Sequence, residues 1–533
     1  MHVCFVTRLT EHLGIQLLSA ICKEAGHQVS HVFDPGLESA GIVPGEWLPK
    51  YLNTDDRSVQ AVLATGADFV GFNVEINTFS WTVEFAQKLK TARPDLTIAV
   101  GGVHATTVPD VVMEFECFDF LCVGEGDEAL PELLERIEAG GDVATVPNIW
   151  ARIDGEIVRN DVRPLLKSLD DLPFFDKSIH YDLVPEMSYE YHTNASRGCV
   201  YSCSFCFYQP IQKVYGQRFR NMRSPENVCR ELEEAMARYP SIRTVTFHDE
   251  VFTANRRWLR EFAEIWPSRV GLPFSIITHP DLVDEEIAGL LGKAGCVHCI
   301  MGTQTVNEAS REMLARTETH EDVRRAVTSL RANGVWTVVD HILGIPGETE
   351  KDQDDALLFY SEIEPDVIKA FFLTYLPGTD MNEVGIEAGE WTLEKLKAAE
   401  RGHIDSWLFK GVGDMPEWRS YYQLFTLFTV VPAPFMKWAV ERDLHKAMKL
   451  MDGLWLPSIF LIPRVAQSLL GGREEQPRSY VNYLKGLFRY AAEVRFGDRM
   501  GGGGARDAAA KGVALAAKAA LKPSRKYGWW RPA

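Results

Sequence analysis

Short apolar runs alternate with helical patterns through the first 150 residues of the chain. The runs typical of strands cover residues 3–6, 28–33, 69–73, 97–100 and 120–123, and the helical patterns cover 15–25, 59–65, 81–91 and 129–139. This alternation is typical of a doubly wound parallel sheet. We therefore expect residues 1–150 to form a Rossmann-like α/β domain that binds its ligand beyond the carboxyl ends of the strands.

A second alternating series follows a Pro-rich, acidic stretch, which we assign as a linker over residues 151–190. Its strand-like runs cover 192–196, 244–248, 274–278, 299–302, 337–343 and 367–373, and its helical patterns cover 224–238, 256–266, 283–294, 320–333 and 350–362. About six strand–helix repeats are too few for a complete eightfold barrel. Residues 191–390 are therefore predicted to form a partial (βα)6 barrel.

The pattern changes again beyond residue 390. Helical runs rich in Trp, Phe and Met, among them 424–435 and 453–462, predict a mainly helical region over 391–500. Neither run reaches the roughly 18 apolar residues that a membrane-spanning helix needs. Residues 501–533 begin with four glycines and are expected to be a flexible tail.

Composition narrows the class of protein. The chain has 533 residues, of which 46% are hydrophobic and 24% charged, which suits a globular protein of about three domains. A net charge of -18 argues against a nucleic-acid partner, because neutralising phosphates needs a basic surface. The N-terminal residues lack the pattern of a secretory signal, so we expect a cytoplasmic protein whose ten cysteines are metal ligands or buried thiols.

The charge is unevenly spread. From Arg495 onward there are nine Lys or Arg residues against Asp498 and Asp507, and the chain ends near Trp529 and Trp530. A basic tail with aromatic residues can lie at a lipid surface, which would suit an apolar substrate and peripheral contact with a membrane. A solvated, disordered end beside ordinary core helices explains the same features equally well.

Cys199, Cys203 and Cys206 form a CxxxCxxC motif where the first barrel strand ends. Three thiolates on one loop occupy three corners of a four-iron cluster, which normally takes four cysteines, and so leave one iron open. A zinc site is the alternative, but three cysteines give no closed tetrahedral set without a fourth ligand. The spacing, with Phe205 before the last cysteine, resembles the signature of the radical S-adenosylmethionine superfamily.

That resemblance implies that the open iron binds S-adenosylmethionine and that reductive cleavage gives a 5′-deoxyadenosyl radical. It places further cofactor contacts at three later strand ends, where an acidic turn, a glutamine and a Pro-Gly loop follow in the expected order. Their structural alternatives are a helix-capping turn and a simple Pro-Gly turn. Gln304 departs from the glutamate of many relatives. The predicted contacts of S-adenosylmethionine are Phe205, Asp249, Glu250, Gln304, Gly344 and Pro346.

Glycine-rich loops follow three strands of the first domain. Glycine permits the backbone to approach a large flat ligand closely. The order of these loops before the CxxxCxxC motif resembles cobalamin-binding radical S-adenosylmethionine proteins, the group of the anaerobic magnesium-protoporphyrin IX monomethyl ester cyclase and of cobalamin-dependent methyltransferases. The predicted cobalamin contacts are Asn73, Gly101, Gly102, Val103, His104, Gly124, Glu125 and Gly126.

Two features of the cobalamin prediction stay open. A lone histidine beside a glycine turn, such as His104, is more often a structural hydrogen-bonder than a ligand. The first strand–helix loop, 8–14, also lacks the Asp-x-His-x-x-Gly sequence that supplies a lower cobalt ligand in some cobalamin domains. The domain could then bind cobalamin without a histidine ligand, bind another nucleotide-like ligand or have lost its ligand.

The resemblance implies an enzyme in which both cofactors serve one reaction. The leading hypothesis is methylation of an unactivated carbon, by hydrogen abstraction followed by methyl transfer from methylcobalamin. An oxidative cyclase or ring-rearranging enzyme would use the same cofactors, and a cobalamin and iron–sulfur sensor without turnover belongs to another class. We expect a small-molecule substrate and an electron donor such as flavodoxin or ferredoxin.

Overall fold

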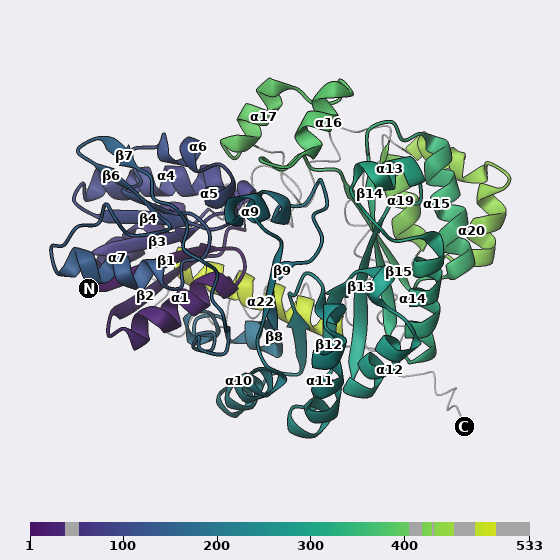
Figure 1. Cartoon of the computed structure of the whole chain (residues 1–533), viewed down its shortest axis with the longest axis horizontal. Helices are drawn as coiled ribbons and strands as arrows, with labels where there is room; N and C mark the ends of the chain where they lie inside the picture. The colour runs from purple at the N-terminus through teal and green to yellow at the C-terminus, as the bar shows by residue number, and fades with distance from the viewer. Residues whose placement is uncertain (38–52, 404–417, 429–430, 452–474, 497–533) are drawn as a thin grey trace.

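The computed structural model describes residues 1–37, 53–403, 418–428, 431–451 and 475–496 (Figure 1). The N-terminal part is built on a seven-stranded sheet of order β2-β1-β3-β4-β5-β6-β7. Its first five strands in this order are parallel, and β6 and β7 are antiparallel. The strands are β1 (His2–Arg8), β2 (Gln28–Asp34), β3 (Phe69–Asn73), β4 (Thr97–Gly101), β5 (Phe120–Cys122), β6 (Ile149–Ile153) and β7 (Glu156–Val158).

Both faces of this sheet are buried, as its apolar sequence predicts. Val3 and Phe5 of β1 belong to one apolar cluster, and Cys4 and Val6 belong to another, because successive side chains point to opposite faces. Helices cover the two faces: α1 (Leu13–Glu24), α3 (Asp55–Thr65), α4 (Ile76–Ala92) and α7 (Ala129–Glu138). The predicted doubly wound class is confirmed, and the sheet continues through β6 and β7 beyond residue 150.

The strand order identifies where a ligand fits this sheet. Because β1 lies between β2 and β3, the connections that leave β1 and β3 diverge to opposite faces. Ligands of doubly wound sheets bind at such a switch point, outside the carboxyl ends of the strands. The loops after β1, β3, β4 and β5 meet at that edge.

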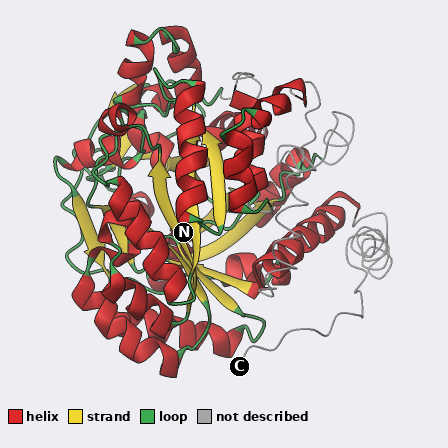
Figure 2. Cartoon of the chain, turned by 90° about the vertical axis from the view of Figure 1, so that its right-hand side faces the viewer, coloured by secondary structure: helices red, strands yellow, loops and turns green. Residues whose placement is uncertain are grey.

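The second part is a six-stranded parallel sheet of order β15-β14-β13-β12-β11-β8. Its strands are β8 (Glu190–Thr193), β11 (Thr244–Phe247), β12 (Phe274–Thr278), β13 (Cys296–Gln304), β14 (Trp336–Leu343) and β15 (Val367–Phe372). Five helices lie outside the strands in Figure 1: α10 (Pro225–Arg238), α11 (Arg256–Arg269), α12 (Glu285–Ala294), α14 (His320–Ala332) and α15 (Glu350–Ile363). Figure 2 views the molecule from this side and shows helices surrounding the strands. This is the predicted partial barrel.

Aromatic side chains fill the space between β11, β12 and α11. Phe247, Phe262, Trp266 and Phe274 are all fully buried and in mutual ring contact. Such rings bury large apolar areas and stabilise one another through edge-to-face geometry. The start of the barrel is therefore a rigid support for the loops at its carboxyl edge.

Segments after the barrel rest on both sheets. Helices α16 (Met381–Glu387) and α17 (Leu393–Glu400) lie above the space between the two parts, and α19 (Arg419–Phe428) and α20 (Ala433–Val440) lie against α15 and β15 (Figure 1). Helix α22 (Glu475–Phe496) returns to the N-terminal sheet, where the Tyr483 hydroxyl donates to the carbonyl of Leu9. The run 453–462 and the predicted tail 501–533 lie outside the described residues.

In the described part of the chain, no helix is both long enough and apolar enough to cross a membrane.

Candidate functional site

The cysteine loop leaves a tight hairpin at the edge of the barrel. Strands β9 (Ser196–Cys199) and β10 (Phe219–Met222) pair antiparallel, so that Gly198 faces Arg220. Gly198 has φ +89°, and a Cβ there would lie 2.3 Å from the carbonyl oxygen of Phe219. Only glycine permits this turn. It places Cys199 at the end of β9, with Cys203 and Cys206 in the loop that precedes α9 (Tyr208–Tyr215).

The three thiols form a polar but enclosed site. Cys199 and Cys203 are buried, Cys206 is half-buried, and the backbone N–H of Tyr201 donates to the Cys199 sulfur at 3.4 Å. Burial raises the pKa of Cys199 to about 11 and raises that of Cys206 as well, and the neighbouring thiols add to both shifts. Enclosed thiols near one another fit a cluster, because iron would replace the protons that burial favours.

No three His, Cys, Asp or Glu side chains in the described ranges gather in the geometry of a single-metal site.

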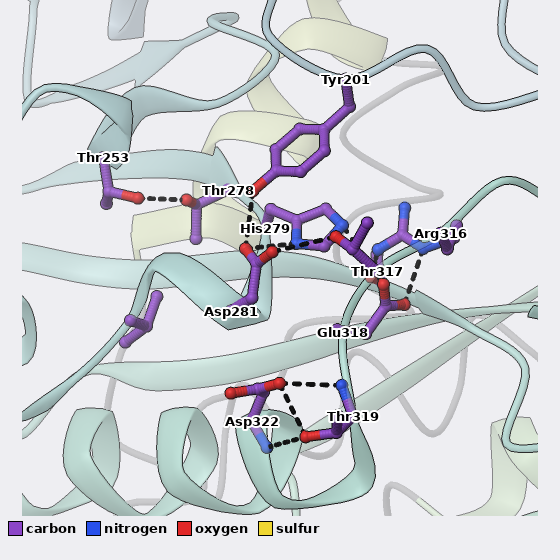
Figure 3. Close-up of polar contacts among 12 residues, drawn as sticks. Tyr201, Thr253, Thr278, His279, Asp281, Arg316, Thr317, Glu318, Thr319 and Asp322 are labelled. Atoms are coloured by element: carbon purple, nitrogen blue, oxygen red, sulfur yellow. Dashed lines mark hydrogen bonds and ion pairs between the residues drawn. The ribbon is translucent and has the colours of Figure 1, made fainter.

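Arg316 lies beside the cysteine loop and was not singled out by its sequence. Its guanidinium is 3.9 Å from the Cys203 sulfur, donates to the carbonyl of Gly302 and forms a 2.6 Å ion pair with Glu318. Glu318 is 1% exposed, so the pair is held in the interior (Figure 3). Burial raises the pKa of Cys203, whereas Arg316 opposes that rise. Arg316 therefore favours the thiolate that a cluster needs.

A second set of contacts continues from Glu318 back to the cysteine loop. His279 lies 3.3 Å from Glu318 and 2.6 Å from Asp281, and Asp281 accepts a 2.7 Å hydrogen bond from the Tyr201 hydroxyl (Figure 3). The Tyr201 ring stacks on His279, with ring centroids 4.0 Å apart. Contacts from outside therefore hold the cysteine loop at two points: Asp281 and His279 contact Tyr201, and Arg316 contacts Cys203.

Two acidic residues follow β11 and have different surroundings. Asp249 is 1% exposed and accepts hydrogen bonds from the backbone N–H of Ala195 and the hydroxyl of Ser196, so it supports the start of β9. Burial and the charge of Asp249 raise the pKa of Glu250 to about 7. Glu250 acts electrostatically on Cys199 and Cys206, which places it near the cysteine loop. A half-buried carboxylate there fits the ammonium group of S-adenosylmethionine.

The other predicted S-adenosylmethionine contacts lie at the ends of β13 and β14. Gln304 has φ +61°, and its amide folds back over Gly302, where a Cβ would lie 2.4 Å from it. A non-glycine residue in this conformation is typical of functional sites. Gly344 has φ +79° and begins the turn that contains Pro346, and Phe205 packs against the apolar cluster that includes Ile345 of the same turn.

The predicted cobalamin loops meet at the switch-point edge of the first sheet. Asn73 pairs in register with Gly101, and its side-chain nitrogen is 2.6 Å from Nδ1 of His12. Gly102 has φ +104°, and a Cβ there would lie 1.9 Å from Oδ1 of Asn73. Val103 begins the short helix α5 (Val103–Thr107). Gly102 is therefore needed to close this turn against the end of β3, at the edge where ligands of such sheets bind.

Residues 124–127 join this edge to the cysteine hairpin. Asp127 accepts two hydrogen bonds from the Arg197 guanidinium, and Glu125 lies 3.4 Å from the same group. The backbone N–H of Glu125 donates to the hydroxyl of Tyr215, which would be 2.3 Å from a Cβ at Gly124. The Cβ position of Gly126 is in ordinary contact with Leu18 and Cys122. The two cofactor loops are therefore in direct contact.

His104 is turned toward the protein interior. It is 2% exposed, its Nε2 is 2.9 Å from the carbonyl oxygen of Glu400, and its ring lies against Phe79. Burial lowers its pKa to about 4, so the ring is neutral near pH 7. These contacts agree with the alternative that His104 is a structural hydrogen-bonding residue. A contact between His104 and cobalamin stays a prediction, as do the other predicted cobalamin contacts.

A histidine pair lies between the two sheets and was also missed. His192 Nδ1 and His248 Nε2 are 2.7 Å apart, and the other nitrogen of His192 is 3.8 Å from Glu11. Glu11 is buried against Lys177 at 3.0 Å. His248 immediately precedes Asp249 and Glu250, and Glu11 follows β1 of the other sheet. The pair and Glu11 therefore connect the strand ends of the two sheets through polar contacts, which sequence spacing could not reveal.

Comparison with known proteins identifies both parts. Residues 193–359 match the model of the radical SAM superfamily, and residues 6–134 match that of the B12 binding domain. These matches confirm the predicted fold class, the predicted kind of enzyme and the cofactor set of S-adenosylmethionine with its cluster and cobalamin.

Among the curated relatives are proteins described as a methyltransferase and as a cyclase. An uncharacterized methyltransferase of Pyrococcus horikoshii is 24% identical over 60% of this chain and 69% of its own length. The anaerobic magnesium-protoporphyrin IX monomethyl ester cyclase of Rubrivivax gelatinosus is 25% identical over 64% of this chain and 63% of its own length. The chain thus spans about two thirds of these two relatives.

Two solved structures share the fold. The radical S-adenosylmethionine methyltransferase TsrM from Kitasatospora setae, solved with cobalamin and a [4Fe-4S] cluster, has a TM-score of 0.59 at 19% identity, over 72% of this chain and 78% of that one. The cobalamin-dependent S-adenosylmethionine radical enzyme OxsB has a TM-score of 0.63 at 14% identity, over 96% of this chain and 83% of that one. At these identities the likeness shows the fold.

Proposed function

Since this chain joins a B12-binding domain to a domain of the radical SAM superfamily, we propose that it methylates an unactivated carbon of a small molecule. The two cofactors would supply a 5′-deoxyadenosyl radical and a methyl group. The observation that carries the proposal is the Arg197 ion pair with Asp127, because it places the cysteine hairpin against the edge of the B12-binding domain. Methyl transfer requires the two cofactors to face one substrate.

The chain's own residues have separable parts in this proposal. Cys199, Cys203 and Cys206 would hold the cluster, with Arg316 favouring the thiolate of Cys203. Glu250 would orient the ammonium group of S-adenosylmethionine by a charge-assisted hydrogen bond. The helices above the two sheets would limit the entry of water, which protects a radical from quenching.

Anaerobic reconstitution with iron, sulfide and cobalamin tests the proposal. After addition of S-adenosylmethionine and a strong reductant, mass spectrometry should detect 5′-deoxyadenosine, and Cys203→Ala should abolish it. Cys229→Ala, at a buried cysteine in α10, is the matched control and should retain activity. Product that gains one carbon with candidate substrates supports methylation.

Oxidative cyclisation or rearrangement is the second candidate, favoured by the cyclase relatives. It would leave the carbon count of the product unchanged. A protein that binds both cofactors but makes no 5′-deoxyadenosine with candidate substrates would instead be a sensor.

The proposal includes an apolar substrate reached at a lipid surface. It is supported by Phe435 and Trp438 of α20, which are 57% and 41% exposed with ring centroids 5.4 Å apart. Flotation with anionic vesicles tests it, and equal binding by the chain lacking 501–533 and carrying Trp438→Gln would reject it.

A further inference from the structure

A basic groove opens beside the cysteine hairpin. It has a volume of about 940 Å³ and lies between β10 and the first turns of α10 and α11. Its walls carry two carboxylates, Asp170 and Glu261, against six cationic side chains: Lys167, Arg220, Arg223, Arg256, Arg257 and Arg260. In a chain of net charge -18, this local excess of positive charge stands out.

The groove reaches the cluster loop directly. Val200, which follows the cluster ligand Cys199, lines the groove and is 40% exposed. Arg220 also lines it and pairs in register with Gly198. The outer surface of the cysteine hairpin is therefore part of the groove wall, which makes the groove a short route from the protein surface to the cluster.

Three of these cations are bound by exposed acidic partners, whereas Arg223 is buried in an ion pair with Glu231. Arg257 is 88% exposed and pairs with Glu261 one turn later, and Arg256 and Arg260 pair with Glu286 while 44% and 55% exposed. Exposed pairs of this kind contribute little energy and exchange readily. An incoming acidic surface can compete for the same guanidinium groups at low cost.

Two other roles, as the substrate site or as a nucleic-acid site, fit the groove less well. The walls do not include Asp249, Glu250, Cys203 or Cys206, so the groove is not the reacting site itself. Nucleic acid would need a basic surface that extends along the phosphate backbone, whereas this chain is acidic overall. A protein that touches a confined basic patch suits the size and the charge.

We propose that this groove is the docking surface for an acidic electron-donor protein of the flavodoxin class, which rests on the proposed function because only a redox cluster needs such a donor. One electron leaves the flavin of the donor and reduces the cluster by one electron, and no atom is transferred. The interfaces between redox partner proteins are typically small, and complementary charge steers their association. The complex should therefore be weak and sensitive to salt.

The charge-reversal variant Lys167→Glu/Arg257→Glu tests the groove without touching the cofactor sites. The control is Lys351→Glu, since Lys351 is 80% exposed and forms the same kind of i,i+4 pair in the first turn of α15. Production of 5′-deoxyadenosine is measured with an acidic flavodoxin hydroquinone and, separately, with titanium(III) citrate. Binding of the flavodoxin to the reconstituted protein is measured at two salt concentrations.

We expect the groove variant to lose about tenfold in flavodoxin binding and flavodoxin-driven turnover, with unchanged turnover on titanium(III) citrate. Wild-type binding should weaken as salt rises, and the Lys351→Glu control should behave as wild type. Equal flavodoxin binding by the groove variant and wild type would overturn the inference, as would an equal loss in the control.

The binding arm separates this inference from the proposed function. If titanium(III) citrate gives no 5′-deoxyadenosine, the proposed function fails, while salt-sensitive binding that depends on Lys167 and Arg257 still supports the docking surface. If a single-stranded RNA displaces the flavodoxin and binds more tightly, the groove belongs to nucleic acid and the inference is wrong.

Discussion

The charge state of Glu250 leads to a prediction about how S-adenosylmethionine binding depends on pH. Burial and Asp249 raise its pKa to about 7, so it is protonated at lower pH and becomes a carboxylate as pH rises through about 7. We expect the affinity for S-adenosylmethionine to rise over that interval, because the carboxylate form binds the ammonium group. Glu250→Gln should weaken binding about tenfold or more at pH 8 and abolish this pH dependence, as measured by calorimetry.

Glu321→Gln provides the comparison, since Glu321 is an exposed acid at the start of α14. An unchanged affinity and pH profile in Glu250→Gln would remove Glu250 from the site.

Arg316 allows a second prediction at the residue scale. Its positive charge lies 3.9 Å from the Cys203 sulfur and stabilises the more negative, reduced form of a cluster held there. Arg316→Gln should therefore shift the midpoint potential to a more negative value, which a redox titration followed by electron paramagnetic resonance measures.

Arg316→Gln also leaves Glu318 buried without its arginine, which costs about 3 kcal/mol in stability. Arg152→Gln is a suitable control, because Arg152 also donates to backbone carbonyls but belongs to the first sheet. A midpoint potential equal to that of the wild-type protein would show that Arg316 has only a structural role.

At the scale of elements, the sequence predicted most of what the fold shows. The period of apolar residues located the strands and helices within a few residues, as with α10 and α14, because their faces are buried. It missed β6 and β7, which are short and only partly buried. No local sequence pattern could predict the contacts of Arg197, Arg316 and Tyr215, because these contacts join segments that are far apart in the chain.

The turn after β4 depends on a single glycine. Gly102→Ala would place a methyl group against Asn73 and the carbonyl of Val74, in a backbone conformation that alanine rarely adopts. We expect at least about a tenfold loss of cobalamin affinity, measured by absorbance titration, because both strand-end loops must shift.

Gly66→Ala separates crowding from backbone strain. Gly66 also has a positive φ, of +70°, but a Cβ there meets nothing within 4 Å. This variant should lose about 1 kcal/mol of stability and keep its cobalamin affinity. Equal cobalamin affinity in the two variants would show that the β4 turn does not contact the ligand.

For the whole molecule, the ion pair of Arg197 with Asp127 links the two cofactor domains. Arg197 is 20% exposed and Asp127 is 6% exposed, so Asp127→Ala leaves a largely buried charge with only Glu125 nearby. We expect a loss of about 3 kcal/mol and faster amide exchange in both loops, 124–127 and 196–199. Chemical denaturation and hydrogen exchange measure the two effects.

Asp110→Ala gives the reference for an exposed ion pair. The pair of Asp110 with Arg159 is 68% and 51% exposed, so its loss should cost less than about 1 kcal/mol. Exchange that rises in one loop alone would mean that the two domains are held together by other contacts.

Helix α22 also determines when the first domain can be completed during synthesis. Tyr490 lies on the buried ring of Phe33, and the Arg57 side chain donates to the carbonyl of Val494. The ribosome makes the first sheet early, yet its last covering helix emerges only after the whole barrel has been made. Until then this surface of the nascent chain is uncovered and available to chaperones, and the final closure joins residues more than 400 positions apart.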